Sequence, residues 1–205
     1  MKFRAVIFDL GGVVLSSPFP SIHRFERTSG LAAGTVARVV TQGGPDGAWA
    51  TLERGEYSME QFYAALDRES ARAGTPFSAR ALMQAIGEAA TLRPEMLEAI
   101  RKLRARGLET AALTNNWKAR DALYRTMGSL REEFDVFVES CRVGIRKPDR
   151  RIYEFALREL GVPAREAIFL DDMGQNLKPA RALGMTTIKV DDPGIALAEL
   201  EALLA

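Results

Sequence analysis

Short apolar segments of the chain alternate with longer amphipathic ones, and this alternation is the feature that most restricts the fold. Five runs of strand length lie at residues 3–8, 110–113, 136–138, 167–170 and 186–190. The first run ends abruptly at an aspartate and two glycines, as buried strands do when they enter a tight turn. The pattern therefore predicts five short buried strands.

Helices with clear start and stop signals separate the later strands. Proline or aspartate marks two of the starts and glycine marks each stop, which is the usual asymmetry of helix ends. The predicted helices run from Pro94 to Gly107, from Asp149 to Gly161 and from about Gly174 to Gly184. Strands that alternate with helices of this length predict an α/β fold, with a parallel sheet covered by helices on both faces.

Residues 16–91 interrupt this alternation, because they contain helical patterns and no convincing strand. Amphipathic stripes such as Val36 with Val39 and Phe62 with Leu66 are typical of helices that pack on one another, and GGPDG at 43–47 predicts a turn. We therefore expect an all-helical cap subdomain at 16–91, inserted into a core that consists of residues 1–15 and 92–205.

Polar side chains stand where three of the predicted strands end. Asp9 follows the first strand, Thr114 and Asn115 follow the second, and Asp171 and Asp172 follow the fourth. The carboxyl ends of parallel strands share one edge of a sheet, and ligands bind in the crevice beyond that edge. We therefore expect these five residues to converge.

Carboxylates gathered at a partly buried edge repel one another, and a divalent cation with oxygen ligands relieves that repulsion. The chain has a single histidine and a single cysteine, so it has no nitrogen and sulfur set for zinc. Magnesium fits the remaining ligands. The sequence predicts Mg²⁺ as the cofactor and a phosphate ester as the group that completes its coordination.

Each residue has a role in that scheme. Asp9 attacks phosphorus as a carboxylate nucleophile, Thr114 and Asn115 donate hydrogen bonds to phosphoryl oxygens, and Lys147 offsets the added negative charge. Each also has a structural interpretation, since an aspartate after a strand often caps a helix and a lysine before proline is usually a solvated loop residue. The catalytic interpretation depends on their occurrence together.

The same residues stand in the order of the four motifs of the haloacid dehalogenase (HAD) superfamily, which the chain resembles. VIFDLGGVV at 6–14 resembles the first motif, LTNN at 113–116 the second, Lys147 the third, and FLDD with Asn176 the fourth. Within that superfamily, the stretches GGPDG, ESCRVGIRKPD and FLDDMGQNLKPARALGM are similar to the N-terminal domains found in soluble epoxide hydrolases and in acyl-CoA dehydrogenase family member ten.

The resemblance implies a Rossmann-like three-layer core with a helical cap, magnesium dependence and an aspartyl-phosphate intermediate. It makes Asp9, the Gly11 carbonyl oxygen and Asp172 the metal ligands, with Asp171 holding a metal-bound water. Asn176 orients Lys147 or a water. The phosphate-binding residues it implies are Thr114, Asn115, Lys147, Gly11 and Gly12.

One position departs from the superfamily pattern. Phosphatases of this superfamily usually carry a second aspartate two residues after the nucleophile, which acts as general acid and base, and here that residue is Gly11. Glycine keeps the carbonyl ligand but transfers no proton. The leading hypothesis is a magnesium-dependent phosphatase of a small phosphorylated metabolite such as a sugar 1-phosphate or an acyl phosphate. The alternatives are a HAD-fold module that binds a phosphorylated ligand or a protein without turnover and, less favoured, a haloacid dehalogenase.

Charge argues against two other classes of partner. The 28 basic and 27 acidic residues give a formal charge of +1 and are scattered along the chain, so we expect neither a nucleic-acid nor a membrane partner. The first apolar run is too short for a signal peptide or a spanning helix, and one cysteine excludes an internal disulfide. We expect a cytoplasmic enzyme, and the sequence makes no prediction of its oligomeric state.

Overall fold

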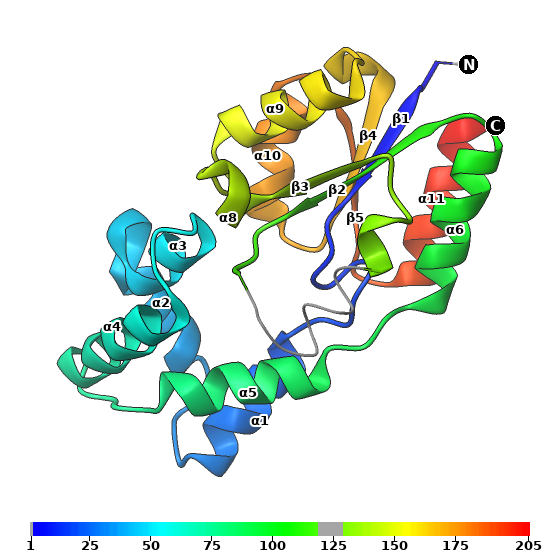
Figure 1. Ribbon diagram of the computed structural model, residues 1–205. Helices are drawn as coiled ribbons and strands as arrows, with labels where there is room; N and C mark the ends of the chain where they lie inside the picture. The colour runs from blue at the N-terminus through cyan, green and yellow to red at the C-terminus, as the bar shows by residue number, and fades with distance from the viewer. Residues whose placement is uncertain (1, 119–128) are drawn as a thin grey trace.

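The computed structural model describes residues 2–118 and 129–205, and its centre is a five-stranded parallel sheet (Figure 1). The strand order is β3-β2-β1-β4-β5, and each neighbouring pair is parallel. The five predicted strands and their parallel arrangement are therefore confirmed. The strands are β1 (Ala5–Phe8), β2 (Glu109–Thr114), β3 (Val136–Glu139), β4 (Ala167–Asp171) and β5 (Thr186–Lys189).

Helices cover both faces of this sheet, and Figure 1 shows one pair on each side. Val6 and Phe8 of β1 belong to the hydrophobic cluster under α6 and α11, whereas Ala5 and Ile7 belong to the cluster under α9 and α10. Successive side chains of a strand point to opposite faces, which is why one strand serves both clusters. The Rossmann-like three-layer core is confirmed. Its helices are α6 (Pro94–Ala105), α9 (Arg150–Leu160), α10 (Gly174–Ala182) and α11 (Pro193–Leu204).

The predicted start and stop signals of these helices are also found. Pro94 is the first residue of α6, and the Asp149 carboxylate accepts a hydrogen bond from the Arg151 N–H to cap α9. Gly161 ends α9 at φ +66°, a left-handed conformation that favours glycine. The described part of the core also contains two short elements, α8 (Ser140–Val143) and the 3₁₀ turn at Ala164–Glu166.

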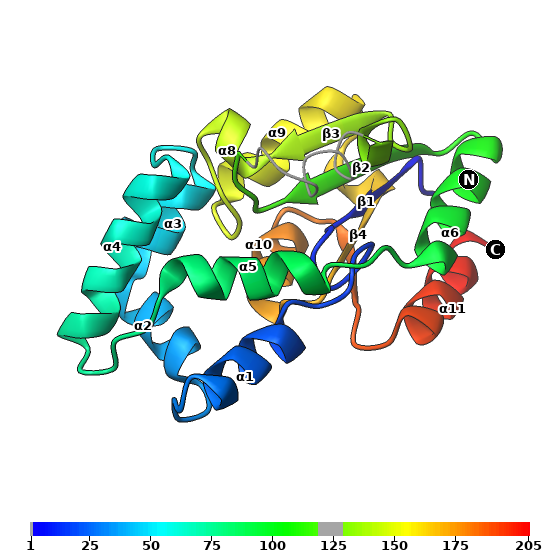
Figure 2. The same ribbon diagram turned by 60° about the horizontal axis from the view of Figure 1, so that its bottom comes forward.

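Five helices occupy the segment between β1 and α6, and they share a hydrophobic cluster of their own. Val36, Val39, Phe62 and Leu66 of the predicted stripes are buried in it. Figures 1 and 2 show this group beyond the carboxyl ends of the strands. The helices are α1 (Phe19–Thr28), α2 (Thr35–Gly43), α3 (Ala48–Glu53), α4 (Met59–Arg72) and α5 (Ala79–Ala89), with a 3₁₀ turn at Gly44–Asp46.

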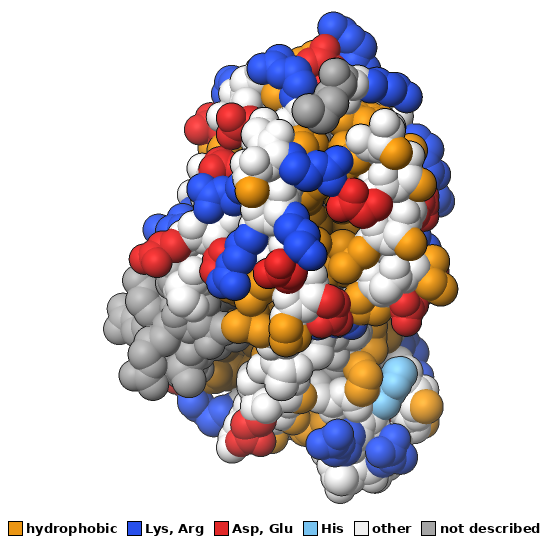
Figure 3. Space-filling model, turned by 90° about the vertical axis from the view of Figure 1, so that its right-hand side faces the viewer, with side chains coloured by type: hydrophobic (Ala, Val, Ile, Leu, Met, Phe, Trp, Pro, Cys, Tyr) orange, Lys and Arg blue, Asp and Glu red, His pale blue; other side chains and the backbone are white. Residues whose placement is uncertain are grey.

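The surface carries charges of both signs. On the face drawn in Figure 3, basic and acidic side chains are interspersed, and the single histidine, His23, is exposed on α1. In the part of the chain that the structure describes, no helix combines the length and the apolar character that crossing a membrane requires.

Candidate active site

Three carboxylates meet at the carboxyl edge of the sheet. Asp9 follows β1, Asp171 ends β4 and Asp172 comes directly after it, and one oxygen from each lies within 4.8 Å of the other two. Parallel pairing of β1 with β4 brings these distant positions together, because Phe8 is opposite Leu170 in the register. The predicted convergence of the strand-end acids is present in the structure.

Lys147 lies buried among these carboxylates with 1% of its surface exposed. Its Nζ is 2.9 Å from Asp9 Oδ1 and 2.7 Å from Asp171 Oδ2. The cluster combines three carboxylates with this one ammonium group, which pairs with two of them, so it carries an excess of negative charge when all are ionised. Lys147 is therefore an integral member of the cluster and not a solvated loop residue.

The pKa values of the cluster reflect this imbalance. The pKa of Asp9 is raised to about 8, chiefly by burial, with Lys147 acting to lower it and the charges of Asp171 and Asp172 adding to the rise. Burial and the charge of Asp171 raise the pKa of Asp172 to about 6. Burial alone lowers the pKa of Lys147, but attraction to Asp9 and Asp171 outweighs it and the pKa is raised. The cluster has a strong tendency to take up positive charge, either as protons or as a cation.

The arrangement of the acids fits a magnesium ion. Asp9 and Asp172 line a cavity beyond the strand ends, whereas Asp171 is fully buried behind them. The hydrogen bonds described for Asp171 occupy both of its oxygens, which accept from Met173 N–H and from Asn176 Nδ2 as well as from Lys147. Asp9 and Asp172 thus present carboxylate oxygens to the cavity, and oxygen ligands are those that Mg²⁺ prefers.

Asn176 has a buried side-chain oxygen that is placed to accept a hydrogen bond at the cavity. Its Nδ2 donates to Asp171, at 3.0 Å and 3.1 Å from the two oxygens, and not to Lys147 as one predicted role would require. Within the described residues its Oδ1 is buried without a hydrogen-bond partner, and the residue lines the cavity. A buried amide oxygen of this kind is a ready acceptor for a water molecule, including one held by a metal ion.

The two glycines after Asp9 differ sharply in what they require. Gly12 has φ +82°, and a Cβ at this position would lie 2.2 Å from Asp172 Oδ2, so only glycine fits. Gly11 lines the cavity, its φ lies outside the left-handed region, and an added Cβ would meet nothing within 4 Å. The backbone does not demand a glycine at the position that lacks the second aspartate.

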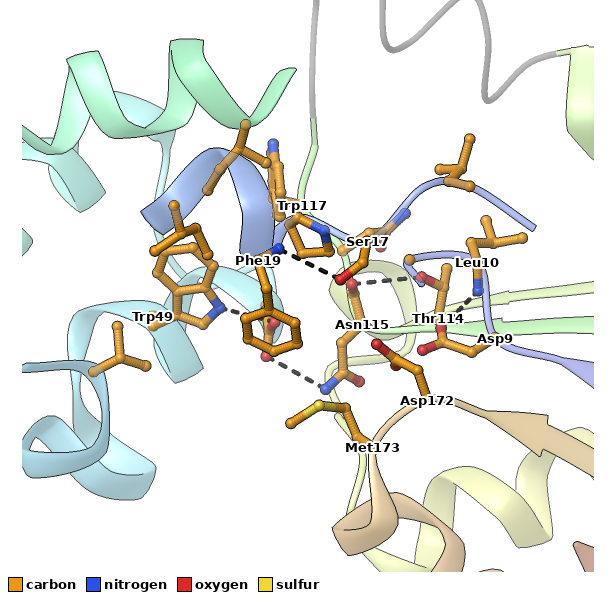
Figure 4. A pocket seen from close by; sticks show the side chains of 18 of the residues that line it. Asp9, Leu10, Ser17, Phe19, Trp49, Thr114, Asn115, Trp117, Asp172 and Met173 are labelled. Carbon is orange, nitrogen blue, oxygen red and sulfur yellow. Dashed lines mark hydrogen bonds between the residues drawn. The ribbon is translucent and has the colours of Figure 1, made fainter. Parts of the chain in front are cut away.

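Thr114 and Asn115 lie beside Asp9 at the end of β2, and Figure 4 shows their side chains together with Asp172. Thr114 is 4% exposed and lines the cavity, where its hydroxyl donates to the Asn115 carbonyl at 3.4 Å. The Asn115 amide donates to the Lys147 carbonyl oxygen at 3.0 Å, and its Oδ1 accepts from the Lys147 N–H at 2.8 Å. Its side chain therefore holds the lysine main chain, and its contact with phosphate stays a prediction.

Some residues of the site were not identified from the sequence. Glu53 and Arg146 form an ion pair at 2.5 Å beside Asn115, and Arg93 Nη1 donates to the Gly12 carbonyl oxygen at 2.8 Å. The sequence contains one indication of a buried role for Glu53. It stands four residues after Trp49, and this spacing places both side chains on the same face of a short, mostly apolar helix. The pKa of Glu53 is raised, because the effect of burial outweighs the attraction to Arg146 that lowers it.

The cavity above the carboxylates has a volume of about 530 Å³ and lies between the strand ends and the α1–α5 group. Figure 4 shows Phe19 and Trp49 across the cavity from Asp9 and Asp172. The Trp49 and Trp117 rings meet edge to face with centroids 6.4 Å apart. The apolar side chains of its wall include Phe19, Ile22, Val40, Trp49, Ile86 and Trp117.

Comparison with known proteins extends these observations. The family model of haloacid dehalogenase-like hydrolases matches residues 3–184. Acyl-CoA dehydrogenase family member 10 of Mus musculus is 42% identical over 206 residues, which are 99% of this chain and 19% of that protein. Bifunctional epoxide hydrolase 2 of Sus scrofa is 36% identical over 214 residues, which are 98% of this chain and 39% of that protein. The chain therefore spans less than half the length of these two relatives.

A shorter relative matches from end to end. A sesquiterpene phosphatase of Aspergillus oryzae is 29% identical over 205 residues, which are 98% of this chain and 97% of that protein. Among solved structures, a HAD-like family hydrolase from Porphyromonas gingivalis superposes with a TM-score of 0.73 at 25% identity, covering 100% of this chain and 98% of that one. A HAD family enzyme of Bacteroides thetaiotaomicron in complex with magnesium and inorganic phosphate has the same fold, with a TM-score of 0.65 at 19% identity over 91% of this chain and 93% of that one.

Proposed function

The chain belongs to the haloacid dehalogenase-like hydrolases, and we propose that it is a magnesium-dependent phosphatase that cleaves phosphomonoesters through a phosphorylated Asp9. The observation that carries this proposal is the placement of Lys147 Nζ between Asp9 and Asp171 at the base of a cavity. A buried lysine beside a carboxylate nucleophile offsets the charge of an arriving phosphate.

The chain's residues divide the work of the first step. The Asp9 carboxylate forms a bond to phosphorus while the bond to the ester oxygen breaks, and the alcohol leaves as an alkoxide that takes a proton from water. Lys147 balances the negative charge that develops, and the Thr114 hydroxyl donates to a phosphoryl oxygen. Asp9, Asp172 and the Gly11 carbonyl oxygen would hold Mg²⁺, which supplies electrostatic stabilisation of the phosphoryl oxygens.

The second step returns the enzyme to its starting state. Water attacks phosphorus of the Asp9 acyl phosphate, the Asp9 carboxylate leaves, and inorganic phosphate is released. Gly11 provides no group to deprotonate that water or to protonate the departing alcohol, so turnover depends on the stability of the leaving group. This is the point at which the chain differs from superfamily phosphatases with a second aspartate.

The cavity wall favours an apolar alcohol as the other half of the substrate. Phe19, Ile22, Trp49 and Trp117 form much of the wall above the carboxylates, and burying apolar surface is worth about 25 cal/mol per Å². A chain that buries roughly 100 Å² there gains about 2.5 kcal/mol, or roughly seventyfold in affinity. A relative with an apolar substrate in its name, the sesquiterpene phosphatase, is similar to this chain over its full length. A sugar phosphate has little apolar surface to bury against this wall and so gains less binding free energy from it.

We further propose that residues 16–91 act as a cap over a core made of residues 1–15 and 92–205. The separate hydrophobic cluster of α1–α5 and its position above the cavity support this division. The single cysteine, Cys141, is buried, which is compatible with the proposed cytoplasmic residence.

The test is a set of matched esters assayed with magnesium and with EDTA. We expect hydrolysis only with magnesium, and a kcat/KM at least about tenfold higher for decyl phosphate than for ethyl phosphate, which releases an equally poor primary alkoxide but has almost no apolar chain to bury. Equal values for the two esters would remove the apolar substrate class. Binding of both without hydrolysis would favour the alternative that Gly11 supports, a ligand-binding module without turnover, and release of halide from a haloacid without magnesium would favour a dehalogenase.

A further inference from the structure

Glu53, at the end of α3, joins the α1–α5 group to the segment that carries Lys147. Its Oε2 is 2.5 Å from Arg146 Nε and accepts from Asn115 Nδ2 at 3.4 Å, while its Oε1 accepts from Trp49 Nε1 at 3.0 Å. We infer that Glu53 is a positioning residue, which makes the placement of Lys147 depend on the seating of α3. The inference rests on the proposed phosphatase function, in which Lys147 is the residue that offsets the charge of phosphate.

Two of the three groups that Glu53 holds, Asn115 and Arg146, fix the Lys147 main chain. Asn115 binds the lysine on both sides, accepting from its N–H at 2.8 Å and donating to its carbonyl oxygen at 3.0 Å. Arg146 is joined to Lys147 by the peptide bond. A shift of the Glu53 carboxylate therefore reaches Lys147 by two short routes, one through hydrogen bonds and one through the chain.

Burial makes this connection sensitive to the position of α3. Glu53 is 7% exposed, and a buried carboxylate is strongly destabilising when its charged partner is removed. Glu53 and Arg146 are 93 residues apart, so their pair forms only when α3 lies against the loop before Lys147. The Lys147 ammonium has two carboxylates to reach, at 2.9 Å and 2.7 Å, and a small displacement of its main chain changes both distances.

The same helix also forms part of the cavity wall. Trp49 lines the cavity, packs edge to face on Trp117, and directs its indole N–H to the other oxygen of Glu53. Trp117 stands two residues after Asn115. The wall that meets the body of the substrate and the anchor of the lysine that meets its phosphate are thus built on one short helix.

Steady-state kinetics of Glu53→Gln tests the inference, with p-nitrophenyl phosphate as the probe. Displacement of a catalytic group by about 1 Å can cost about a hundredfold, so we expect kcat to fall by about tenfold to a hundredfold with KM changed by less than about threefold. Glu56→Gln is the matched control, because Glu56 forms an exposed ion pair with Arg54 at 2.6 Å close to the same helix. A residue that serves only stability would lower Tm and leave kcat at 25 °C unchanged, and that result would overturn the inference.

Two further measurements separate this inference from the proposed function. In a double-mutant cycle with Arg146→Met, the double variant should lose no more kcat than the more damaged single variant, within about twofold, because both act on one unit; additive losses would count against it. If the wild-type protein hydrolyses no ester, the proposed function fails. The link between Glu53 and Lys147 is then tested by the rate at which the Lys147 amine is acylated in the native protein. We expect mass spectrometry to find Lys147 labelled at least about fivefold faster in Glu53→Gln than in wild type and in Glu56→Gln, whereas equal rates would refute a link between Glu53 and Lys147.

Discussion

Replacing Gly11 with aspartate should supply the proton-transfer group that the chain lacks. Gly11 lines the cavity two residues after Asp9, its φ is outside the left-handed region, and an added Cβ meets nothing within 4 Å. The substitution therefore carries no backbone strain and no clash at the Cβ, in contrast to the same change at Gly12. The carbonyl oxygen of residue 11 remains available to the metal.

The size of the effect follows from general acid–base catalysis. A positioned acid or base contributes about 10²-fold to 10⁴-fold, or roughly 2.7 to 5.5 kcal/mol of transition-state stabilisation. A fourth carboxylate is repelled by Asp9, Asp171 and Asp172, so we expect the lower end of this range, about a hundredfold in kcat, for alkyl phosphates. Aryl phosphates release a stable phenolate and should gain less than about tenfold at the first step.

The assay is kcat and KM of wild type, Gly11→Asp and Gly11→Asn on decyl phosphate and p-nitrophenyl phosphate at fixed magnesium. Gly11→Asn is the matched control, because it has nearly the same shape as the aspartate and transfers no proton. Magnesium affinity and Tm are measured for each variant. If affinity and folding are unchanged and Gly11→Asp hydrolyses decyl phosphate no faster than wild type or Gly11→Asn, the interpretation of Gly11 as a missing acid is wrong.

Three further predictions follow from the same cluster. Asp9→Asn should abolish hydrolysis and keep the wild-type circular dichroism spectrum, since the amide is similar in shape but is a far poorer nucleophile; retained turnover would remove Asp9 from the mechanism. Gly12→Ala should weaken magnesium binding at least about tenfold by calorimetry, because its Cβ would lie 2.2 Å from Asp172 Oδ2 at φ +82°, and wild-type affinity would show that Asp172 is not a ligand. The folded pKa values of Asp9, about 8, and Asp172, about 6, both lie above the unfolded value of 3.8, so the metal-free protein holds extra protons and loses stability as pH rises from about 4 to about 8. Magnesium replaces those protons, so the rise in Tm on adding it should be larger at pH 8 than at pH 5, and an equal rise at both would separate metal binding from these acids.

The sequence predicted the core of this fold because its signals are local. Apolar runs of four to six residues form the strands of the sheet, and Gly161 and Gly184 end helices in left-handed conformations that other residues rarely adopt. Convergence of Asp9 with Asp171 and Asp172 followed from a general property of parallel sheets, since their carboxyl ends share one edge.

The remaining features depend on how separate segments meet, which no local pattern encodes. Glu53 pairs with Arg146, the residue before Lys147, only because α3 is placed against that loop, and no local pattern predicts the distance between those segments. The Asn115 amide was predicted to face phosphate, but its nearest partners are the main-chain groups of Lys147. The apolar wall of the cavity likewise combines side chains from helices whose packing the hydrophobic stripes did not specify.

Trapping of the intermediate tests the central claim most directly. The protein is mixed with excess p-nitrophenyl phosphate and magnesium, quenched in acid within one turnover, digested, and searched by mass spectrometry for an acyl phosphate. The account predicts phosphate on Asp9 when magnesium is present, none when EDTA replaces it, and none in Asp9→Asn. Phosphate on a different residue, or rapid hydrolysis with Asp9 unmodified throughout, would contradict it.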